Sequence, residues 1–300
     1  MAGFQKLTLI RISEATNTGT QPLRSLEKQH RTPSEKQELL LQNLKNLGSV
    51  IIAFSGGTDS AYLSWAAHKA LGQNALSVTA LSPSFSAHDR HQAISFAREH
   101  GLRHELIETY EFENPLYIAN QPDRCYHCKV ELFSRMAKLR EIQNAGAIAY
   151  GVNVDDLRDF RPGHRAAAEY GILAPLLDAR LTKSEIRGLS QIAGLSTWDR
   201  PAAACLSSRV PYGTEVTVED LSRIERGESV LRDLGFRQFR VRSHGNLARI
   251  EIEAPELERA LEIEMARTLA ERIRSVGFAY VTLDLEGYRQ GSLNSVLKRK

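Results

Sequence analysis

The chain has 300 residues, of which 42% are hydrophobic and 25% charged, a composition typical of a soluble globular protein of about two domains. Its 39 basic and 36 acidic residues give a formal net charge of +3, so composition alone indicates no surface for binding polyanions. Apolar runs such as Val50–Phe54 are far shorter than the roughly 18 residues of a membrane-spanning helix, and the polar N-terminus does not resemble a signal peptide. We therefore expect a cytoplasmic protein.

The first 33 residues are polar and show no sustained hydrophobic period. We expect residues 1–33 to form a disordered leader. Pro33 and Ser34 then open a predicted helix, with leucines at helical spacing and a stop at Gly48.

Between this helix and about residue 210, apolar runs of strand length alternate with amphipathic stretches. The predicted strands cover residues 50–54, 75–81, 104–107 and 147–152, and the predicted helices cover 60–71, 87–100, 129–144 and 183–193. Such an alternation predicts βαβ units, and hence an α/β fold with a parallel sheet covered by helices on both faces. We assign residues 34–210 to this domain.

The pattern changes near Pro211. It predicts, in order, a helix, two strands joined by a short turn, a helix and a strand, at residues 218–234, 237–243, 247–253, 256–275 and 278–285. This order indicates a small α+β domain with an antiparallel sheet over residues 211–300.

The segment Ser55–Ser60, here called the glycine loop, reads Ser-Gly-Gly-Thr-Asp-Ser between a predicted buried strand and a predicted helix. This layout directs backbone N–H groups and a helix N-terminus at one place and so predicts a phosphate site. Asp59 in such a site indicates a bridging Mg²⁺ or capping of the loop's own amides. The sequence matches neither the Walker A pattern nor the dinucleotide fingerprint, and a plain strand-to-helix turn is the alternative.

The chain contains three cysteines, an odd number that argues against a disulfide framework and leaves metal binding, redox chemistry or nucleophilic catalysis. Cys125 and Cys128 form a C-x-x-C beside Arg124 and Lys129 at a predicted helix start, where positive charge and the helix N-terminus should lower the thiol pKa. Two packed thiols or a thioredoxin-like pair are alternatives. A zinc site is another, with Cys205 and one histidine among His127, His164 and His244.

The third cysteine lies in Arg200–Gly213, here called the cysteine loop, which is rich in Ala, Pro, Ser and Gly. We expect an ordered loop in which Arg200 and Arg209 favour the Cys205 thiolate as a nucleophile facing the nucleotide. A buried, inert cysteine is the alternative.

The glycine loop resembles the PP-loop of the N-type ATP pyrophosphatases. This resemblance implies an adenine nucleotide alpha hydrolase-like fold, and it implies that Ser55, Gly56, Gly57, Asp59 and Ser60 hold the pyrophosphate part of ATP with Mg²⁺. It also implies cleavage of ATP between the α and β phosphates and adenylation of a substrate oxygen.

Over about residues 35–295 the chain resembles more narrowly the ATP-dependent sulfur transferases of the LarE family. The segments that carry this resemblance are residues 151–163, 182–187, 200–213, 240–251 and 285–294. It implies that the carboxylates of pyridinium-3,5-biscarboxylic acid mononucleotide become thiocarboxylates, in the biosynthesis of a nickel-pincer nucleotide cofactor. It also suggests a homo-oligomer, while the sulfur donor stays open.

The LarE resemblance implies one of two sulfur sources. Members with a single cysteine sacrifice its sulfur, whereas members with the added C-x-x-C are thought to hold a four-iron four-sulfur cluster. We expect a cluster on Cys125, Cys128 and Cys205, with Cys205 catalytic, because three thiolates leave one iron open for sulfur. Sacrifice of Cys205 is the alternative. A tRNA thiolation enzyme is a further alternative, although the near-neutral charge makes a nucleic-acid partner a poor fit.

Two further segments offer substrate contacts. Arg240 and Arg242 share one face of a predicted strand, and although a solvated face with salt bridges is the plain reading, the resemblance favours a grip on the substrate phosphate. Several charged residues follow a predicted strand end, where α/β folds bind ligands; they are Asp155, Asp156, Asp159 and Arg161.

Overall fold

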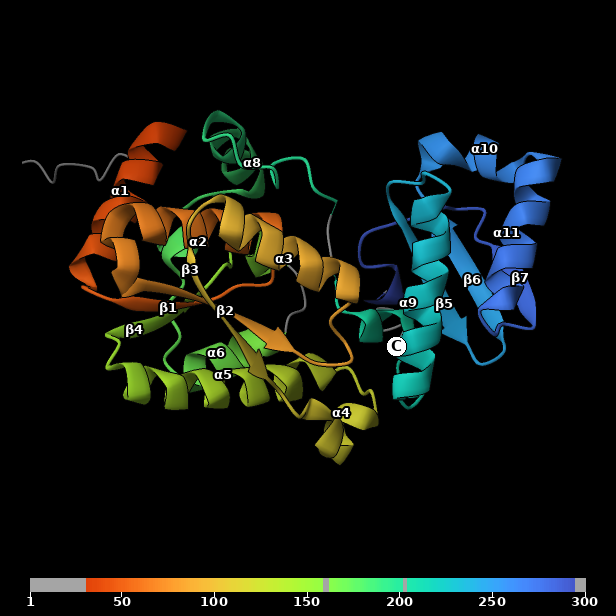
Figure 1. Ribbon diagram of the computed structural model, residues 1–300, viewed down its shortest axis with the longest axis horizontal. Helices are drawn as coiled ribbons and strands as arrows, with labels where there is room; N and C mark the ends of the chain where they lie inside the picture. The colour runs from red at the N-terminus through yellow and green to blue at the C-terminus, as the bar shows by residue number, and fades with distance from the viewer. Residues whose placement is uncertain (1–30, 159–161, 202–203, 295–300) are drawn as a thin grey trace, which may run out of the picture. The chain divides into compact units, whose positions relative to one another are not determined.

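The computed structural model describes residues 31–158, 162–201 and 204–294 (Figure 1). The helices and strands up to residue 200 are α1 (Pro33–Asn46), β1 (Val50–Ala53), α2 (Thr58–Leu71), β2 (Ala75–Leu81), α3 (Ala87–Glu99), β3 (Arg103–Glu108), α4 (Pro115–Ile118), α5 (Arg124–Gln143), β4 (Ala147–Tyr150), α6 (Gly163–Glu169), α7 (Pro175–Asp178) and α8 (Lys183–Ile192). Those that follow are α9 (Val218–Asp233), β5 (Phe239–His244), β6 (Leu247–Ile252), α10 (Leu257–Leu261), α11 (Ile263–Ser275) and β7 (Tyr280–Leu283). Residues 1–30 of the predicted leader lie outside the described residues.

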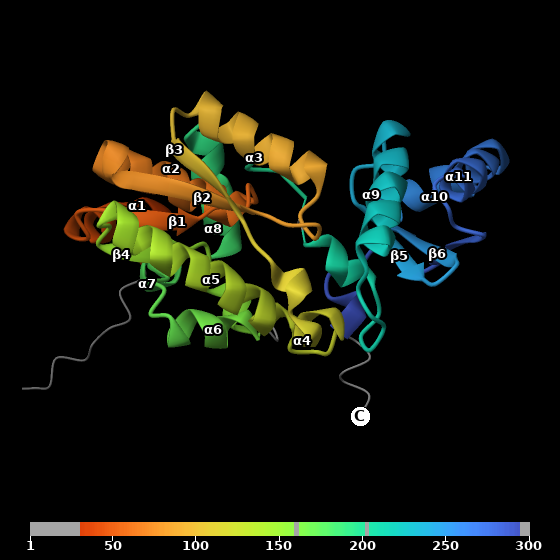
Figure 2. The ribbon, with the colours of Figure 1, turned by 60° about the horizontal axis from the view of Figure 1, so that its bottom comes forward.

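The first sheet is parallel, with the strand order β3-β2-β1-β4, which confirms the predicted α/β fold. Alternate side chains of β1 enter different cores. Val50 and Ile52 pack with residues of α1, α2, α3 and α8, whereas Ile51 packs with residues of α5 and α6. Figures 1 and 2 show these two groups of helices on opposite faces of the sheet. Because both faces are buried, β1 is apolar throughout and the two polar side chains of β2, Ser77 and Thr79, are themselves buried.

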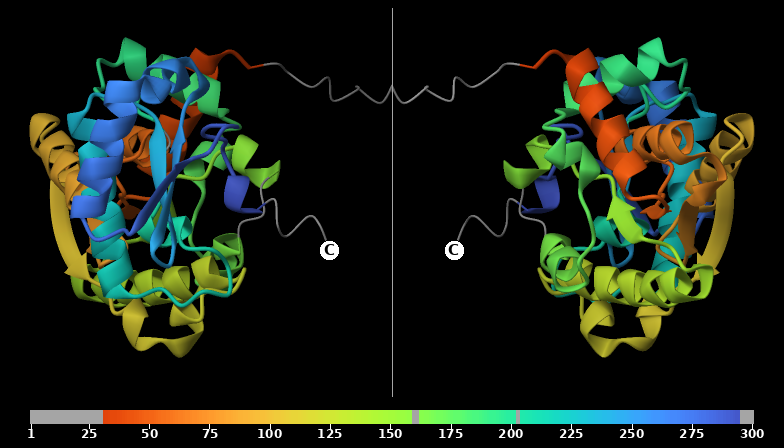
Figure 3. Two further views of the ribbon diagram at one scale, coloured as in Figure 1. Left: turned by 90° about the vertical axis from the view of Figure 1, so that its right-hand side faces the viewer. Right: turned by 90° about the vertical axis from the view of Figure 1, so that its left-hand side faces the viewer.

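The second sheet has the order β5-β6-β7 and is mixed. β5 pairs with β6 in the antiparallel sense, but β6 and β7 run parallel, so the prediction of an antiparallel sheet is wrong for the last strand. The physical reason is the connection: α10 and α11 carry the chain back along the sheet, and a parallel neighbour needs such a crossover. The single predicted helix over 256–275 is interrupted at Glu262, whose backbone is extended. Figure 3 (left) shows this part of the chain.

Buried residues of the C-terminal part form their own cluster with α9, α11 and the second sheet. This cluster begins at Leu206 in the cysteine loop. The cysteine loop therefore packs into the C-terminal core, while the domain boundary near Pro211 stays a prediction.

Gly151 follows β4 directly and lies against the backbone at the start of α2. A Cβ built on Gly151 would lie 2.8 Å from the backbone nitrogen of Ser60 and 2.9 Å from its Cα. Neither atom can move without shifting the glycine loop, so only glycine fits between these two backbones.

We predict that Gly151→Ala destabilises the chain by about 1–3 kcal/mol, because the added methyl group overpacks against backbone. Gly188→Ala is the matched control, since Gly188 lies inside α8 with open space around it, and it should stabilise by about 0.5–1 kcal/mol. Denaturant unfolding measures both. Equal effects of the two substitutions would contradict the close approach.

Candidate functional site

The glycine loop presents an uncapped helix N-terminus. Gly57 is the N-cap residue of α2, and no side chain caps the first amides of this helix. Gly56 has a φ of +72°, and a Cβ there would lie 3.0 Å from the Cβ of Ala93, so both conformation and space require glycine. The hydroxyl oxygens of Ser55 and Ser60 lie 3.1 Å apart. The first backbone N–H groups of α2 and the hydroxyls of Ser55 and Ser60 thus lie at one place, and a helix N-terminus of this kind can bind phosphate.

Arg200 contacts the glycine loop directly. Its guanidinium donates to the carbonyl of Gly56 at 2.6 Å and to the carboxylate of Asp89 at 2.7 Å. The sequence predicted that this arginine favours the Cys205 thiolate, but the groups that it is seen to bond are in the loop and in α3. Arg200 therefore ties the first residue of the cysteine loop to the glycine loop.

The C-x-x-C lies in the first turn of α5, as predicted, because this helix begins at Arg124. All three cysteines are free thiols; Cys125 and Cys205 are exposed, and Cys128 is half-buried. The negative charge of Cys205 contributes to raising the pKa of both α5 thiols, Cys125 and Cys128. Cys205, 80 residues beyond Cys125 in the sequence (205 − 125), is thus close enough for its charge to affect both α5 thiols.

The predicted lowering of the thiol pKa is wrong for the α5 pair. Solvent reaches Cys125, yet protein atoms crowd around its thiol, and this burial together with the charge of Cys205 raises its pKa despite Arg124. Burial, with the Glu111 carboxylate, likewise raises the pKa of Cys128. The removal of water from the sulfur atoms outweighs the nearby cations.

No three His, Cys, Asp or Glu side chains within the described residues are grouped so that they could hold a metal ion. Two of the histidines predicted as possible zinc ligands have other partners: His127 pairs with Asp123 at 3.4 Å, and His164 packs edge-on against Tyr150. A preformed zinc site is therefore not seen in this part of the chain.

The turn after Cys205 is ordered, as predicted. The Leu206 amide donates to the carbonyl of Ser84, beyond the end of β2, at 2.9 Å. Arg209 donates to the Cys205 carbonyl at 2.9 Å and makes two bonds to the Glu228 carboxylate, at 2.8 and 3.0 Å. Arg209 and Glu228 are both buried, so a bidentate ion pair fixes the turn to α9.

Arg240 and Arg242 lie on a buried face of β5, so the solvated face considered from the sequence is wrong. The cross-strand salt bridges considered with it are confirmed, because Arg242 pairs with Glu251 of β6. Arg242 donates to the carbonyl of Ser208 at 2.6 Å and to Glu251 at 2.7 Å. Arg240 lies over the ring of Tyr288, and burial with the nearby positive charge of Arg209 lowers its pKa to about 10. Arg242 therefore contacts the cysteine loop, and the charge of Arg209 in that loop reaches Arg240.

The acidic residues after β4 accept hydrogen bonds from backbone amides. Asp155 accepts from the amide of Lys183 at 2.7 Å, and Asp156 accepts from the amide of Asn153 at 3.1 Å. Asp159 and Arg161 lie outside the described residues. No local motif marks Glu228, Asn120 or Tyr117, because these residues act through bonds to residues far away in the sequence.

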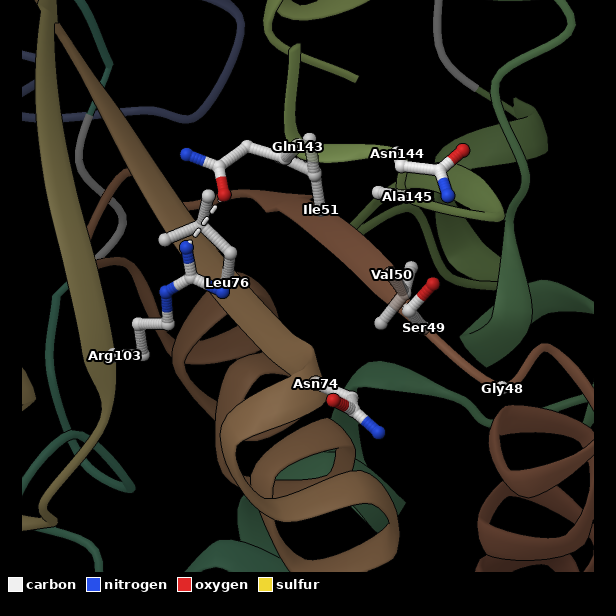
Figure 4. A pocket seen from close by; sticks show the side chains of 10 residues that line it. All are labelled: Gly48, Ser49, Val50, Ile51, Asn74, Leu76, Arg103, Gln143, Asn144 and Ala145. Atoms are coloured by element: carbon white, nitrogen blue, oxygen red, sulfur yellow. Dashed lines mark hydrogen bonds between the residues drawn. The ribbon is translucent and has the colours of Figure 1, made fainter. Parts of the chain in front are cut away.

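A separate cavity of about 270 Å³ lies at the amino ends of the first-sheet strands (Figure 4). Its lining includes Arg103, which donates to Gln143 at 2.7 Å. It contains no residue of the glycine loop and no cysteine. Ligands of open α/β sheets bind at the carboxyl ends of the strands, so this cavity is not the candidate site.

Among the described residues, no helix is both long enough and apolar enough to cross a membrane.

No protein-family model matches the chain. Individual proteins, however, are similar to it over most of its length. The chain is 35% identical over 270 residues to the pyridinium-3,5-bisthiocarboxylic acid mononucleotide synthase of Lactiplantibacillus plantarum. The aligned region covers 89% of this chain and 97% of that protein. It is 46% identical to an uncharacterized protein of Synechocystis, over 88% of this chain and 98% of the relative. It is also 32% identical to an uncharacterized protein of Methanocaldococcus jannaschii, over 83% and 94%.

We predict that Glu228→Gln destabilises the chain by about 3–5 kcal/mol at pH 7, because it leaves the buried Arg209 charge without its partner. Burial by itself would raise the pKa of Glu228, but Arg209 holds it below the ordinary value of 4.5. The pair therefore stabilises fully above that ordinary value, and its contribution is lost as the pH falls through the lower, folded-state pKa.

Unfolding measured at pH 7 and again below pH 4 should show the difference between Glu228→Gln and the parent shrinking with acidity. Glu264→Gln is the control, because its ion pair with Arg267 is largely exposed and should contribute nothing measurable. A pH-independent difference would refute the ion-pair assignment.

Proposed function

Because the chain belongs to the LarE family, that of the pyridinium-3,5-bisthiocarboxylic acid mononucleotide synthase, we propose that it is an ATP-dependent sulfur transferase. Its substrate is pyridinium-3,5-biscarboxylic acid mononucleotide, and its products are the thiocarboxylate, AMP and pyrophosphate. One observation carries the proposal: Arg200 bonds the glycine loop from the start of the cysteine loop. An anion site and a thiol site therefore share one region of the molecule.

ATP would bind with its pyrophosphate part on the glycine loop, at Ser55, Gly56, Gly57, Asp59 and Ser60. The uncapped amides of α2 supply N–H donors to the phosphate oxygens. Asp59 lies in the first turn of that helix and offers the oxygen ligand that Mg²⁺ prefers. Donors and cation together would stabilise the charge that builds up on the leaving pyrophosphate.

The reaction proceeds in two displacements. A substrate carboxylate oxygen attacks the α-phosphorus of ATP, the bond to the bridging oxygen breaks, and pyrophosphate leaves. A sulfur nucleophile then attacks the acyl carbon, and AMP departs with the carboxylate oxygen. Adenylation is needed because a carboxylate is a poor electrophile. Two carboxylates on one substrate consume two ATP and two sulfur atoms.

Thiolates are the ligands of four-iron four-sulfur clusters, and this chain offers three, although the described side chains are not grouped as a metal site in this structure. All three are free thiols. The charge of Cys205 contributes to the raised pKa of both Cys125 and Cys128, which supports a shared site. Cys125, Cys128 and Cys205 would hold the cluster, and a cluster with three protein ligands supplies an iron position at which inorganic sulfide can bind. The alternative uses Cys205 alone. Its sulfur would attack the acyl carbon, and loss of the Cα proton with cleavage of the Cβ–S bond would leave dehydroalanine.

Arg240 and Arg242 are proposed to hold the substrate phosphate. The guanidinium group of arginine can bond two phosphate oxygens at once, and that of Arg242 lies beside the turn after Cys205, where it bonds Ser208. Both side chains are nearly enclosed by protein, which strengthens their attraction for an anion.

We predict that the purified chain releases pyrophosphate from ATP only when the biscarboxylate mononucleotide is added. Asp59→Asn should lower kcat at least tenfold, because the Mg²⁺ ligand is lost. A pyrophosphate assay, run in parallel with tRNA as the substrate, measures this. Release that depends on tRNA would make the chain a tRNA thiolation enzyme instead.

The double variant Arg240→Ala, Arg242→Ala tests the phosphate site within the same assay. It should raise KM for the mononucleotide while binding of Mg-ATP persists. Arg249→Ala is the control, because Arg249 also bonds Glu251 but belongs to neither proposed site. Loss of ATP binding in the double variant would overturn the assignment.

We predict that anaerobic reconstitution with iron and sulfide gives a brown protein with about four iron atoms per chain, and that Cys128→Ser abolishes the colour. Absorption spectra with iron and sulfide analysis measure this. A colourless protein whose mass falls by one hydrogen sulfide at Cys205 during turnover would establish sacrifice of that cysteine.

A further inference from the structure

A buried polar cluster joins the segment before α5 to the cysteine loop. Asn120 is fully buried and has a φ of +51°, a left-handed conformation that asparagine tolerates better than most residues. Its side-chain amide donates to three backbone carbonyls, those of Val210, Pro211 and Thr214, at 3.3, 2.8 and 2.9 Å. One side chain therefore holds the end of the cysteine loop in place.

Arg124 continues this contact toward the cysteines. It is buried and directly precedes Cys125 at the start of α5. Its Nη1 donates both to the Oδ1 of Asn120 and, at 2.8 Å, to the carbonyl of Ser207. The hydroxyls of Tyr117 and Ser207 bond at 2.6 Å. Ser207 is thus bonded through both its backbone and its side chain by residues that flank the C-x-x-C.

The charge environment agrees with these contacts. Burial by itself would lower the pKa of Arg124, but the negative charges of Cys205 and Cys125 raise it. The guanidinium therefore lies close to one thiol from α5 and to the thiol of the cysteine loop.

Both α5 and the cysteine loop also have anchors other than these bonds. The body of α5 is anchored by Leu132, Phe133 and Met136 in the core beneath the first sheet. The turn after Cys205 is held by the Arg209–Glu228 pair. What the Asn120–Arg124 contact adds is a fixed relation between the two.

We propose that Asn120 and Arg124 are positioning residues that set the separation of Cys125 from Cys205. The inference deepens the proposed function, because a site shared by cysteines from two elements works only if their spacing is held. It does not depend on ATP, substrate or iron.

The chain contains only three cysteines, so Cys128→Ser leaves Cys125 and Cys205 as the single pair. Dibromobimane, a short bifunctional thiol reagent, fluoresces strongly only when both of its arms have reacted. In this background, reduced and metal-free, we expect Arg124→Gln and Asn120→Ala each to lower the cross-linking yield about fivefold, as the loss of a buried bond permits the two elements to separate. Monofunctional bromobimane should still label both thiols in each variant.

Arg259→Gln in the same background is the control for general destabilisation, because Arg259 bridges Leu234 and Glu256 within the C-terminal part. Its yield should equal that of the parent. Where Arg124→Gln does not fold, Arg124→Lys keeps the charge and most of the stem but not the fork, and its yield should still fall. Folded variants of Arg124 with parental yield would overturn the proposal. The assay contains no nucleotide or metal, so its outcome is separate from that of the pyrophosphate and iron measurements.

Discussion

The turn that carries Cys205 is held by buried arginines instead of by regular pairing with a strand. Arg209 donates to the carbonyl of Cys205, Arg124 to that of Ser207 and Arg242 to that of Ser208. Carbonyls of an irregular buried turn have no ladder partners and must be satisfied by side chains. Arginine suits this task because one guanidinium can bond a carbonyl and a second group together. The position of the proposed sulfur site therefore rests on three cations from different elements.

This arrangement has an electrostatic consequence. Glu228 and Glu251 are buried beside these arginines and balance part of their charge. Burial, and after it the positive charge of Arg209, lowers the pKa of Arg240 to about 10. Such surroundings favour anions, and phosphates, carboxylates and thiolates are the groups that the proposed reaction handles. The same residues can thus stabilise the fold and prepare the site.

Local patterns were sufficient for the first sheet and insufficient for the second. Largely apolar runs located β1, β2 and β4, because strands covered on both faces bury nearly all of their side chains. The direction of β7 could not be predicted in this way, since it depends on how α10 and α11 return the chain. The burial of Arg240 and Arg242 could not be predicted for a related reason. The alternation of side chains along a strand shows that the two arginines share a face, but it does not show what covers that face.

The sequence by itself determined the α/β architecture, the glycine loop and the three cysteines, because each follows from spacing and residue chemistry within a short segment. The tertiary structure decided the rest. It placed Arg200 on the glycine loop and Arg124 on the cysteine loop, and it reversed the expected pKa shift of the α5 thiols. These outcomes depend on burial and on bonds between residues far apart in the chain, which only the folded arrangement defines.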